Sequence, residues 1–217
     1  VSLRDSLSWR EKLPLFGKKI VNTRSRRQAS ALTRDLYALG ADVIEVPTLD
    51  IEPAAEGGDL DREIGRIGEY GWLLFTSPNG VQSFFDLLLK RHGDVRALGG
   101  VRIGCIGPGT AQAVADHHVR PAVTAAEAMA EGFLKALEPL GPWTGKKVLL
   151  ARAAVARDVL PATLKAWGAA VTVATAYRTV RPSGLDAETI EAVADGRYDC
   201  ITFSSSSTFT NLLDLFT

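Results

Sequence analysis

Residues 72–80 read Trp-Leu-Leu-Phe-Thr-Ser-Pro-Asn-Gly, and the amphipathic stretch 81–90 follows them. Four consecutive apolar residues predict a strand buried on both faces, and the polar and glycine residues after them predict a turn into a helix. Further apolar runs lie at 19–23, 43–47 and 101–106, with helical spacing between them. Apolar strands that alternate with helices indicate a parallel sheet covered on both faces, so we expect a doubly wound α/β fold.

The first strand region returns later in the chain. Residues 17–24 (Gly-Lys-Lys-Ile-Val-Asn-Thr-Arg) match residues 145–152 (Gly-Lys-Lys-Val-Leu-Leu-Ala-Arg) at an offset of 128 residues. Between 17–89 and 145–217, 17 of 73 aligned positions are identical. This repeat predicts an internal duplication that gives two similar units. The second copy stops where the first continues into 101–110, so we expect one unit to be incomplete at its C-terminal part.

Composition excludes several classes of protein. The 25 basic and 25 acidic residues give a net charge of zero, so no global field attracts nucleic acid or an anionic membrane. No apolar run reaches the ~18 residues that span a bilayer. Cys105 and Cys200 lie in apolar runs, which predicts free thiols and a cytoplasmic location. His117 and His118 are adjacent and cannot both bind one metal from a helix, so no metal site is expected.

Polar residues at the carboxyl ends of the strands are the candidates for function, because ligands of parallel sheets bind there. Arg24 and Arg152 close the first strand of each copy. Each could hold a carboxylate or phosphate bidentately, or could equally be a structural or solvated arginine.

Two hydroxyl-rich segments, 76–79 and 204–207, each follow an apolar strand and begin a helix. Helix N-termini bind anions through free N–H groups and the helix dipole, although the same hydroxyls can simply cap the helix. Their matching positions in the two copies favour a shared anion-binding function. The members considered are Thr76, Ser77, Pro78, Asn79, Ser204, Ser205 and Ser206.

Two further features stand at strand ends. Residues 107–109, Gly-Pro-Gly, resemble part of a dinucleotide loop, but Gln112 replaces the last glycine of that motif and Pro108 lacks an N–H donor. A tight turn that presents Thr110 at a helix start fits better. Tyr177 stands opposite Leu49 in the repeat. Its phenol could pack in the core or donate a proton to a leaving group.

Five segments together, in this order and spacing, resemble the successive motifs of the uroporphyrinogen-III synthase family. They are Val21-Asn22-Thr23-Arg24, Leu74–Gly80, Ile106–Ala111, Thr175-Ala176-Tyr177-Arg178-Thr179 and Ile201–Ser206. The resemblance runs from about Gly17 to Thr217. Residues 7–16 resemble the joint that follows a fused uroporphyrinogen-III C-methyltransferase.

The resemblance implies a reaction and an architecture. The substrate would be hydroxymethylbilane, a linear tetrapyrrole with many carboxylates, which closes with loss of water and inversion of its last ring. No cofactor is implied. The fold would be two flavodoxin-like domains joined by a two-stranded connector, with the active site between them. We expect a leader at 1–16, one domain from 17–42 plus 180–217, the other at 52–170, and connectors at 43–51 and 171–179.

The resemblance also assigns roles to residues. Tyr177 matches the family's tyrosine that assists departure of the hydroxyl, and Thr76, Ser77, Thr110 and Ser204 match binding positions. The expected substrate-binding set is Arg24, Thr76, Ser77, Pro78, Asn79, Thr110, Arg152, Ser204, Ser205 and Ser206. We expect a monomer, with hydroxymethylbilane synthase or a fused methyltransferase as its partner. The alternatives are a two-lobed protein that binds small anions without catalysis, and a nucleotide-dependent enzyme that uses the turn at 107–109.

Overall fold

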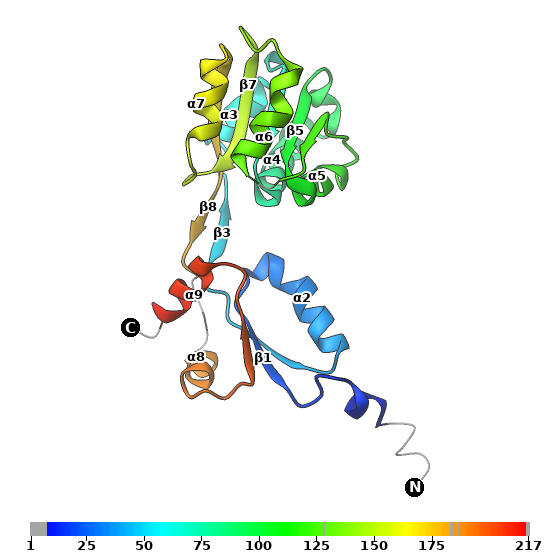
Figure 1. The fold of residues 1–217 in the computed structure, drawn as a ribbon, viewed down its shortest axis with the longest axis vertical. Coiled ribbons are helices and arrows are strands. Elements are labelled where there is room, and N and C mark those ends of the chain that lie inside the picture. The colour runs from blue at the N-terminus through cyan, green and yellow to red at the C-terminus, as the bar shows by residue number, and fades with distance from the viewer. Residues whose placement is uncertain (1–7, 128, 183–184, 186, 216–217) are drawn as a thin grey trace. The chain divides into compact units, whose positions relative to one another are not determined.

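The structure of the protein is a computed structural model, which describes residues 8–127, 129–182, 185 and 187–215. The chain forms two compact units (Figure 1). Unit 1 comprises Val1–Ile51 and Thr179–Thr217, and unit 2 comprises Glu52–Arg178. Both contain parallel strands that alternate with helices, so the predicted α/β class is confirmed. Among the described residues, none of the helices is both long and apolar enough to cross a membrane.

Unit 1 is built around a short parallel sheet. Its strands are β1 (Lys19–Asn22), β2 (Asp42–Glu45) and β9 (Cys200–Thr202), in the order β2-β1-β9. Its helices are η1 (Ser8–Lys12), α2 (Arg26–Ala38), α8 (Ala187–Ala194) and α9 (Ser206–Leu213). The core joins Val21 of the central strand to Val46, Val193 and Leu212. Residues 8–16, expected as a leader, belong to this unit, because Leu15 N donates to Leu39 O at 2.9 Å. The first seven residues of that leader lie outside the described residues.

Unit 2 contains the larger sheet, whose order is β3-β8-β7-β4-β5-β6. Its strands are β3 (Asp50–Pro53), β4 (Trp72–Phe75), β5 (Arg102–Ile106), β6 (Val123–Ala125), β7 (Lys147–Ala153) and β8 (Ala170–Val180). Its helices are α3 (Asp59–Gly65), η2 (Ile67–Glu69), α4 (Pro78–His92), η3 (Val95–Leu98), α5 (Gly107–Ala115), α6 (Ala130–Leu137), η4 (Glu138–Leu140) and α7 (Val159–Ala166). The strands from β8 to β6 pair in parallel.

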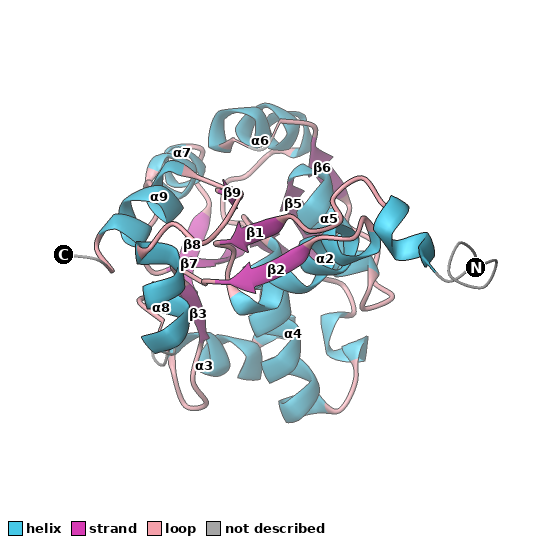
Figure 2. Cartoon of the chain, turned by 90° about the horizontal axis from the view of Figure 1, so that it is seen from below, coloured by secondary structure: helices cyan, strands magenta, loops and turns pink. Residues whose placement is uncertain are grey.

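The central strands β4, β5 and β7 of the unit 2 sheet are buried on both faces, as their apolar residues predict. Leu73 and Phe75 of β4 pack with the helices α3, α4 and α5, whereas Trp72 and Leu74 pack with α6 and α7. Figure 2 shows α6 and α7 on one side of these strands and α3 and α4 on the other. Alternate residues of one strand therefore serve two separate cores, which is the physical basis of the doubly wound layering.

The strand registers of the two units correspond at the offset of the sequence repeat. Ile20 pairs with Val43 in unit 1, and Val148 pairs with Val171 in unit 2. Likewise, Val21 of β1 pairs with Ile201, and Leu149 of β7 pairs with Leu73. The orders β2-β1-β9 and β8-β7-β4 are thus the same arrangement. In each, the central strand of one sequence copy pairs with a strand from the other copy.

The expected connector strands need correction. Residues 43–51 do not form one connector: β2 ends at Glu45 in the sheet of unit 1, and β3 begins at Asp50 as the neighbour of β8. Pro47 lies in this gap and has no N–H for a strand ladder. Residues 171–179 are part of the single strand β8, which starts in the sheet of unit 2 and continues to Val180. No turn-forming residue interrupts β8, so the strand runs on through the boundary between the units.

Candidate functional site

The carboxyl ends of three neighbouring strands of unit 2 meet at one edge of the sheet. Phe75 of β4 pairs with Cys105 of β5 and with Ala151 of β7. The residues at and just after these strand ends therefore lie side by side, because parallel strands end at the same edge. They include Thr76, the start of α5 at Gly107, and Arg152, all of which come from segments that the sequence singled out.

Ser77 and Tyr177 are in direct contact at this edge. Ser77 Oγ donates a hydrogen bond to Tyr177 Oη at 3.0 Å across 100 residues of sequence. The same Ser77 Oγ caps α4 by accepting from Gly80 N at 3.2 Å. The capping interpretation is therefore true of Ser77, but it is not the whole of its role. Ser77 also links the N-terminus of a helix to the phenol of a distant strand.

The backbone of β8 is irregular where it presents Tyr177. The register of β7 and β8 shifts between Arg152 and Ala153, so that Ala153 pairs with Tyr177. Tyr177 O then accepts from Ala154 N at 2.9 Å. A bulge of this kind re-aims the side chains beside it and is common next to functional sites. It holds the half-buried phenol within reach of the N-terminus of α4.

A cavity of about 410 Å³ lies beside Tyr177 within unit 2. Thr175, Tyr177 and Arg178 of β8 form one wall, and residues 52–62 of β3, its following loop and α3 form the other. Arg62 is held in place, because its Nη1 donates to Gly57 O at 2.7 Å and its Nη2 pairs with Asp59. Arg178 is exposed and has no ion pair or side-chain hydrogen bond among the described residues. Its guanidinium is therefore open to an anionic ligand.

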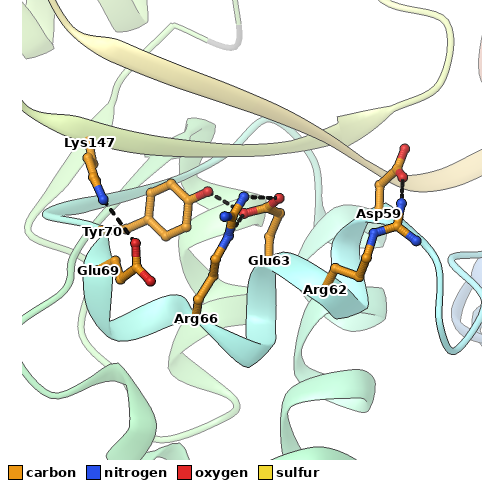
Figure 3. A network of polar contacts seen from close by, with 7 residues as sticks. All are labelled: Asp59, Arg62, Glu63, Arg66, Glu69, Tyr70 and Lys147. Carbon is orange, nitrogen blue, oxygen red and sulfur yellow. Dashed lines mark hydrogen bonds and ion pairs between the residues drawn. The ribbon is translucent and has the colours of Figure 1, made fainter.

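The helix α3, which lines this cavity, is anchored by the polar network in Figure 3. Arg66 Nε and Nη2 each donate to Glu63 at 2.7 Å, and Tyr70 Oη donates to the same carboxylate. The hydrogen bonds from Arg66 hold the pKa of Glu63 below its usual value, and burial raises the pKa of Tyr70. These groups stabilise the position of α3 rather than react, because the network already satisfies them.

Arg152 and Thr76 line a smaller hollow of about 120 Å³ on the other side of the strand ends. The Arg152 side chain is 12% exposed, and it pairs with Asp158 at 2.6 Å and donates to Arg157 O at 2.8 Å. Of the two roles that the sequence left open for Arg152, the structure shows the structural one. It fixes the exposed loop 154–158 over this hollow.

The position of Thr110 in its helix differs from the predicted one. It does not stand at the start of α5 but in the fourth position of that helix, and it is only 3% exposed. The helix begins earlier, because Gly107 adopts a φ of 74° at the strand end and Pro108 fits the first turn. Pro78 and Asn79 occupy the first turn of α4, where Pro78 is exposed and Asn79 half-buried.

The remaining candidates lie in unit 1 at the carboxyl ends of β1 and β9, which are neighbouring parallel strands. Arg24 is exposed there, as are Ser204, Ser205 and Ser206. Ser205 caps α9 by accepting from Thr208 N at 3.3 Å, and Thr208 Oγ1 accepts from Ser205 N at 3.2 Å. The capping interpretation therefore holds for this second serine segment as well.

Within the described part of the chain, no group of three or more His, Cys, Asp or Glu side chains could hold a metal ion. A family model described as uroporphyrinogen-III synthase HemD matches residues 30–217. The chain belongs to the uroporphyrinogen-III synthase family.

Relatives within and around this family support the assignment. A porphyrin biosynthesis protein HemD from Ruminiclostridium josui is 32% identical over 211 residues, which cover 95% of this chain and 41% of that protein. A uroporphyrinogen-III synthase from Synechococcus elongatus is 31% identical over 206 residues, covering 93% of this chain and 76% of that protein. This chain thus spans less than half of the first relative and about three quarters of the second.

A solved structure shows the same fold. The crystal structure of a mutant uroporphyrinogen III synthase from Thermus thermophilus superposes with a TM-score of 0.60 at 20% identity. The match covers 91% of this chain and 77% of that one. At this identity the likeness establishes the mixed α/β fold with parallel sheets and nothing about individual residues.

Sequence reasoning missed the two arginines of the cavity. Arg178 stands directly after Tyr177 in a motif that the uroporphyrinogen-III synthase resemblance had already marked, so its position was a usable signal. Arg62 had no such signal, because only the packing of α3 against the end of β8 brings it to Tyr177.

Proposed function

We propose that the chain is a cyclising lyase that closes hydroxymethylbilane into uroporphyrinogen III with release of one water molecule. The observation that carries this proposal is the contact between Ser77 and Tyr177 beside a cavity that contains an open arginine, in a chain of this family. The cavity offers a proton donor and a cation together, which suits a hydroxylated polycarboxylate.

Tyr177 is proposed as the acid for the first step. The bond that breaks joins the terminal methylene carbon of the bilane to its hydroxyl oxygen. Tyr177 gives its proton to that oxygen, water leaves, and the neighbouring pyrrole nitrogen supplies the electron pair that stabilises the remaining cation. The tyrosinate recovers a proton when the newly joined ring loses one. General acids of this kind contribute ~10²–10⁴ in rate.

Ser77 prepares Tyr177 for this role. Because Ser77 Oγ donates to Tyr177 Oη, the phenol's own hydrogen is left for the substrate. Because Ser77 Oγ also accepts from Gly80 N, the serine hydroxyl is fixed in direction and polarised. Ser77 is thus proposed as a positioning residue, in addition to the substrate-binding role expected from the sequence.

Arg178 is proposed to bind a carboxylate of the ring next to the reacting carbon. It is the better candidate of the two arginines, because Arg62 is already paired with Asp59. Glu52 lines the same cavity and is exposed, so its carboxylate is suited to the cation that forms when water leaves. The enzyme's main task is to hold the last ring so that its substituted carbon attacks.

The other expected residues complete the proposed set. Arg24 and the segment 204–206 are proposed to bind further carboxylates from unit 1, where their side chains are exposed at helix and strand ends. Thr76 and Asn79 serve the same purpose at the start of α4 in unit 2, and Pro78, which has no N–H to donate, fits the first turn of that helix. Thr110 and Arg152 are proposed to stabilise this edge of the sheet and not to contact the substrate. Thr110 is buried, and Arg152 is paired with Asp158.

The two units are proposed to be flavodoxin-like domains that arose by duplication. The equal strand orders β2-β1-β9 and β8-β7-β4, in registers offset by the same 128 residues as the sequence repeat, support a common origin. The chain passes from one unit to the other within β3, between Ile51 and Glu52, and within β8, between Arg178 and Thr179. A cytoplasmic setting is also proposed, because Cys105 and Cys200 are both free thiols.

The reaction outcome tests the proposal directly. Hydroxymethylbilane closes spontaneously to isomer I, whereas the proposed activity gives isomer III. Freshly prepared hydroxymethylbilane is incubated with the chain, the products are oxidised, and the isomers are separated by HPLC. Isomer III should dominate with native chain and disappear with heat-denatured chain. An isomer ratio that native chain does not change would reject the proposed activity.

A further inference from the structure

Another cavity lies at the opposite edge of the sheet of unit 2, beside the amino ends of β4, β5 and β7. Its volume is about 350 Å³. The residues that matter for its chemistry are Gly71, Trp72, Gly100, Arg102 and Lys146, with residues 140–142 closing one side. Because Trp72 and Arg102 are at the amino ends of their strands, this cavity is separate from the one beside Tyr177.

The charge in this cavity is entirely positive. Arg102 and Lys146 are its charged lining residues, and both side chains are exposed. Neither makes an ion pair or a side-chain hydrogen bond to any residue that the structure describes. The neighbouring Lys147 differs, because it pairs with Glu69 at 2.9 Å. Two cations that share one hollow without a counter-charge repel each other, and a bound anion would remove that repulsion.

The guanidinium of Arg102 is held in a defined position. It lies 4.5 Å from the centroid of the Trp72 ring. That ring is itself buried and packs against Trp143 at 5.2 Å, and Trp143 Nε1 donates to Leu137 O at 3.1 Å. Stacking on a fixed aromatic face leaves the edge of the guanidinium fork free for an oxyanion. Little side-chain entropy then remains to be lost on binding.

Two glycines leave the walls of the cavity bare. Gly100 has a φ of 88°, and a Cβ added there would meet no atom within 4 Å. A Cβ added at Gly71 would meet only Lys147 O at 3.8 Å. An anion can therefore approach the backbone at both positions, which is a common use of glycine beside ligands.

We propose that this cavity is a binding site for a small dianion, held between the Arg102 fork and the Lys146 ammonium. The ligand class is an oxyanion or dicarboxylate that carries two negative charges within a few ångströms. The proposal is independent of the reaction at Tyr177, because the two cavities share no lining residue.

Titration of the native chain with two probes tests the site. Inorganic phosphate and malonate are added separately at pH 8 and constant ionic strength, and tryptophan fluorescence is followed, since Trp72 and Trp143 adjoin the site. We expect saturation with a Kd of the order of 1 mM. The double substitution Arg102→Gln/Lys146→Gln should weaken binding at least about tenfold. Arg96→Gln, which removes one positive charge outside the cavity at a side chain that is 90% exposed, should not.

Each outcome decides the proposal. Binding of only one of the two probes supports the site and identifies the class of its ligand. Phosphate indicates a phosphoryl group, and malonate indicates a dicarboxylate. Saturation that the double variant retains, or no saturation with either anion, overturns it. Should the double variant fail to give the native circular dichroism spectrum, Arg102→Lys replaces it, because it keeps the charge and removes the stacked fork. Formation of isomer III should be unaffected by either variant, which separates this site from the proposed reaction.

Discussion

In unit 1, β1 pairs with β2 and β9 in the same register in which β7 of unit 2 pairs with β8 and β4. The helix after β9 and the helix after β4 are also capped alike. Ser205 accepts from Thr208 N at 3.3 Å, and Ser77 accepts from Gly80 N at 3.2 Å. The strand pairing and the helix N-caps are therefore common to both units. These shared features do not by themselves form a candidate catalytic site.

The difference lies in the strand beside each cap. In unit 2, β8 continues to Val180 and brings the hydroxyl of Tyr177 to Ser77. In unit 1, the equivalent strand β2 ends at Glu45, and the position that matches Tyr177 is the half-buried Leu49. Ser205 instead exchanges hydrogen bonds with Thr208. A capped helix becomes a candidate catalytic site only where a second strand supplies a reactive partner.

The largest effect is expected from removing that partner. Tyr177→Phe should lower turnover to isomer III by about 100-fold, the lower end of general-acid effects, because the proton donor is lost and the ring is kept. Initial rates by HPLC measure the change. Tyr37→Phe, at a tyrosine of α2 that is 48% exposed, is the matched control and should retain the native rate. Activity of Tyr177→Phe within a factor of two of the native chain would mean that Tyr177 only packs.

Replacing the two N-cap serines, Ser77 and Ser205, should change the kinetics of the reaction in different ways. Ser77→Ala and Ser205→Ala each remove one N-cap and should each lower stability by about 1 kcal/mol in urea unfolding. Ser77→Ala should in addition lower kcat about tenfold, because Tyr177 loses the donor that orients it. Ser205→Ala should act on KM, through substrate binding, with kcat near the native value. Equal changes in kcat for the two variants would contradict the distinction between the units.

The smallest effect concerns the anchor of α3, which has no equivalent assigned in unit 1. Arg66 lowers the pKa of Glu63 in the folded state, so this carboxylate stabilises the fold above its unfolded pKa. That contribution is lost as the pH falls below about 4.5 and through the lowered folded pKa. Glu63→Gln should therefore lower stability at pH 7 by about 1 kcal/mol and reduce the loss between pH 6 and pH 3.

Urea unfolding at pH 7, pH 6 and pH 3, followed by tryptophan fluorescence, measures these changes in stability. Glu69→Gln is the control, because Glu69 and its partner Lys147 are both more than half exposed and should matter less. A pH dependence that Glu63→Gln leaves unchanged would show that other carboxylates control acid unfolding.

Several local features were predictable because they depend on short stretches of chain. Trp72–Phe75 was predicted as a buried strand and is β4 within the same bounds. The apolar run 101–106 was likewise predicted as a strand, and it contains β5 (Arg102–Ile106). Burial of consecutive apolar residues is a local pattern, so the order of residues reveals it.

Features that depend on how the chain folds, and not on one short residue pattern, were not predictable. The sequence placed Thr110 at a helix start, but α5 begins at Gly107 and buries Thr110. It left the role of Arg152 open, and only the fold brings Asp158 to it. The 43–51 connector was wrong, because pairing with β1 and with β8 divides that segment between two sheets.

The sequence by itself determined the α/β class, the repeat offset and the strand ends at which polar residues gather, because hydrophobic patterning and internal identity are written in the order of residues. Only the tertiary structure decided which of those residues meet. Ser77 and Tyr177 are 100 residues apart and touch because β8 passes the start of α4. Arg62 and Arg178, and likewise Arg102 and Lys146, share cavities because packing brings separate elements together, and no local pattern encodes that proximity.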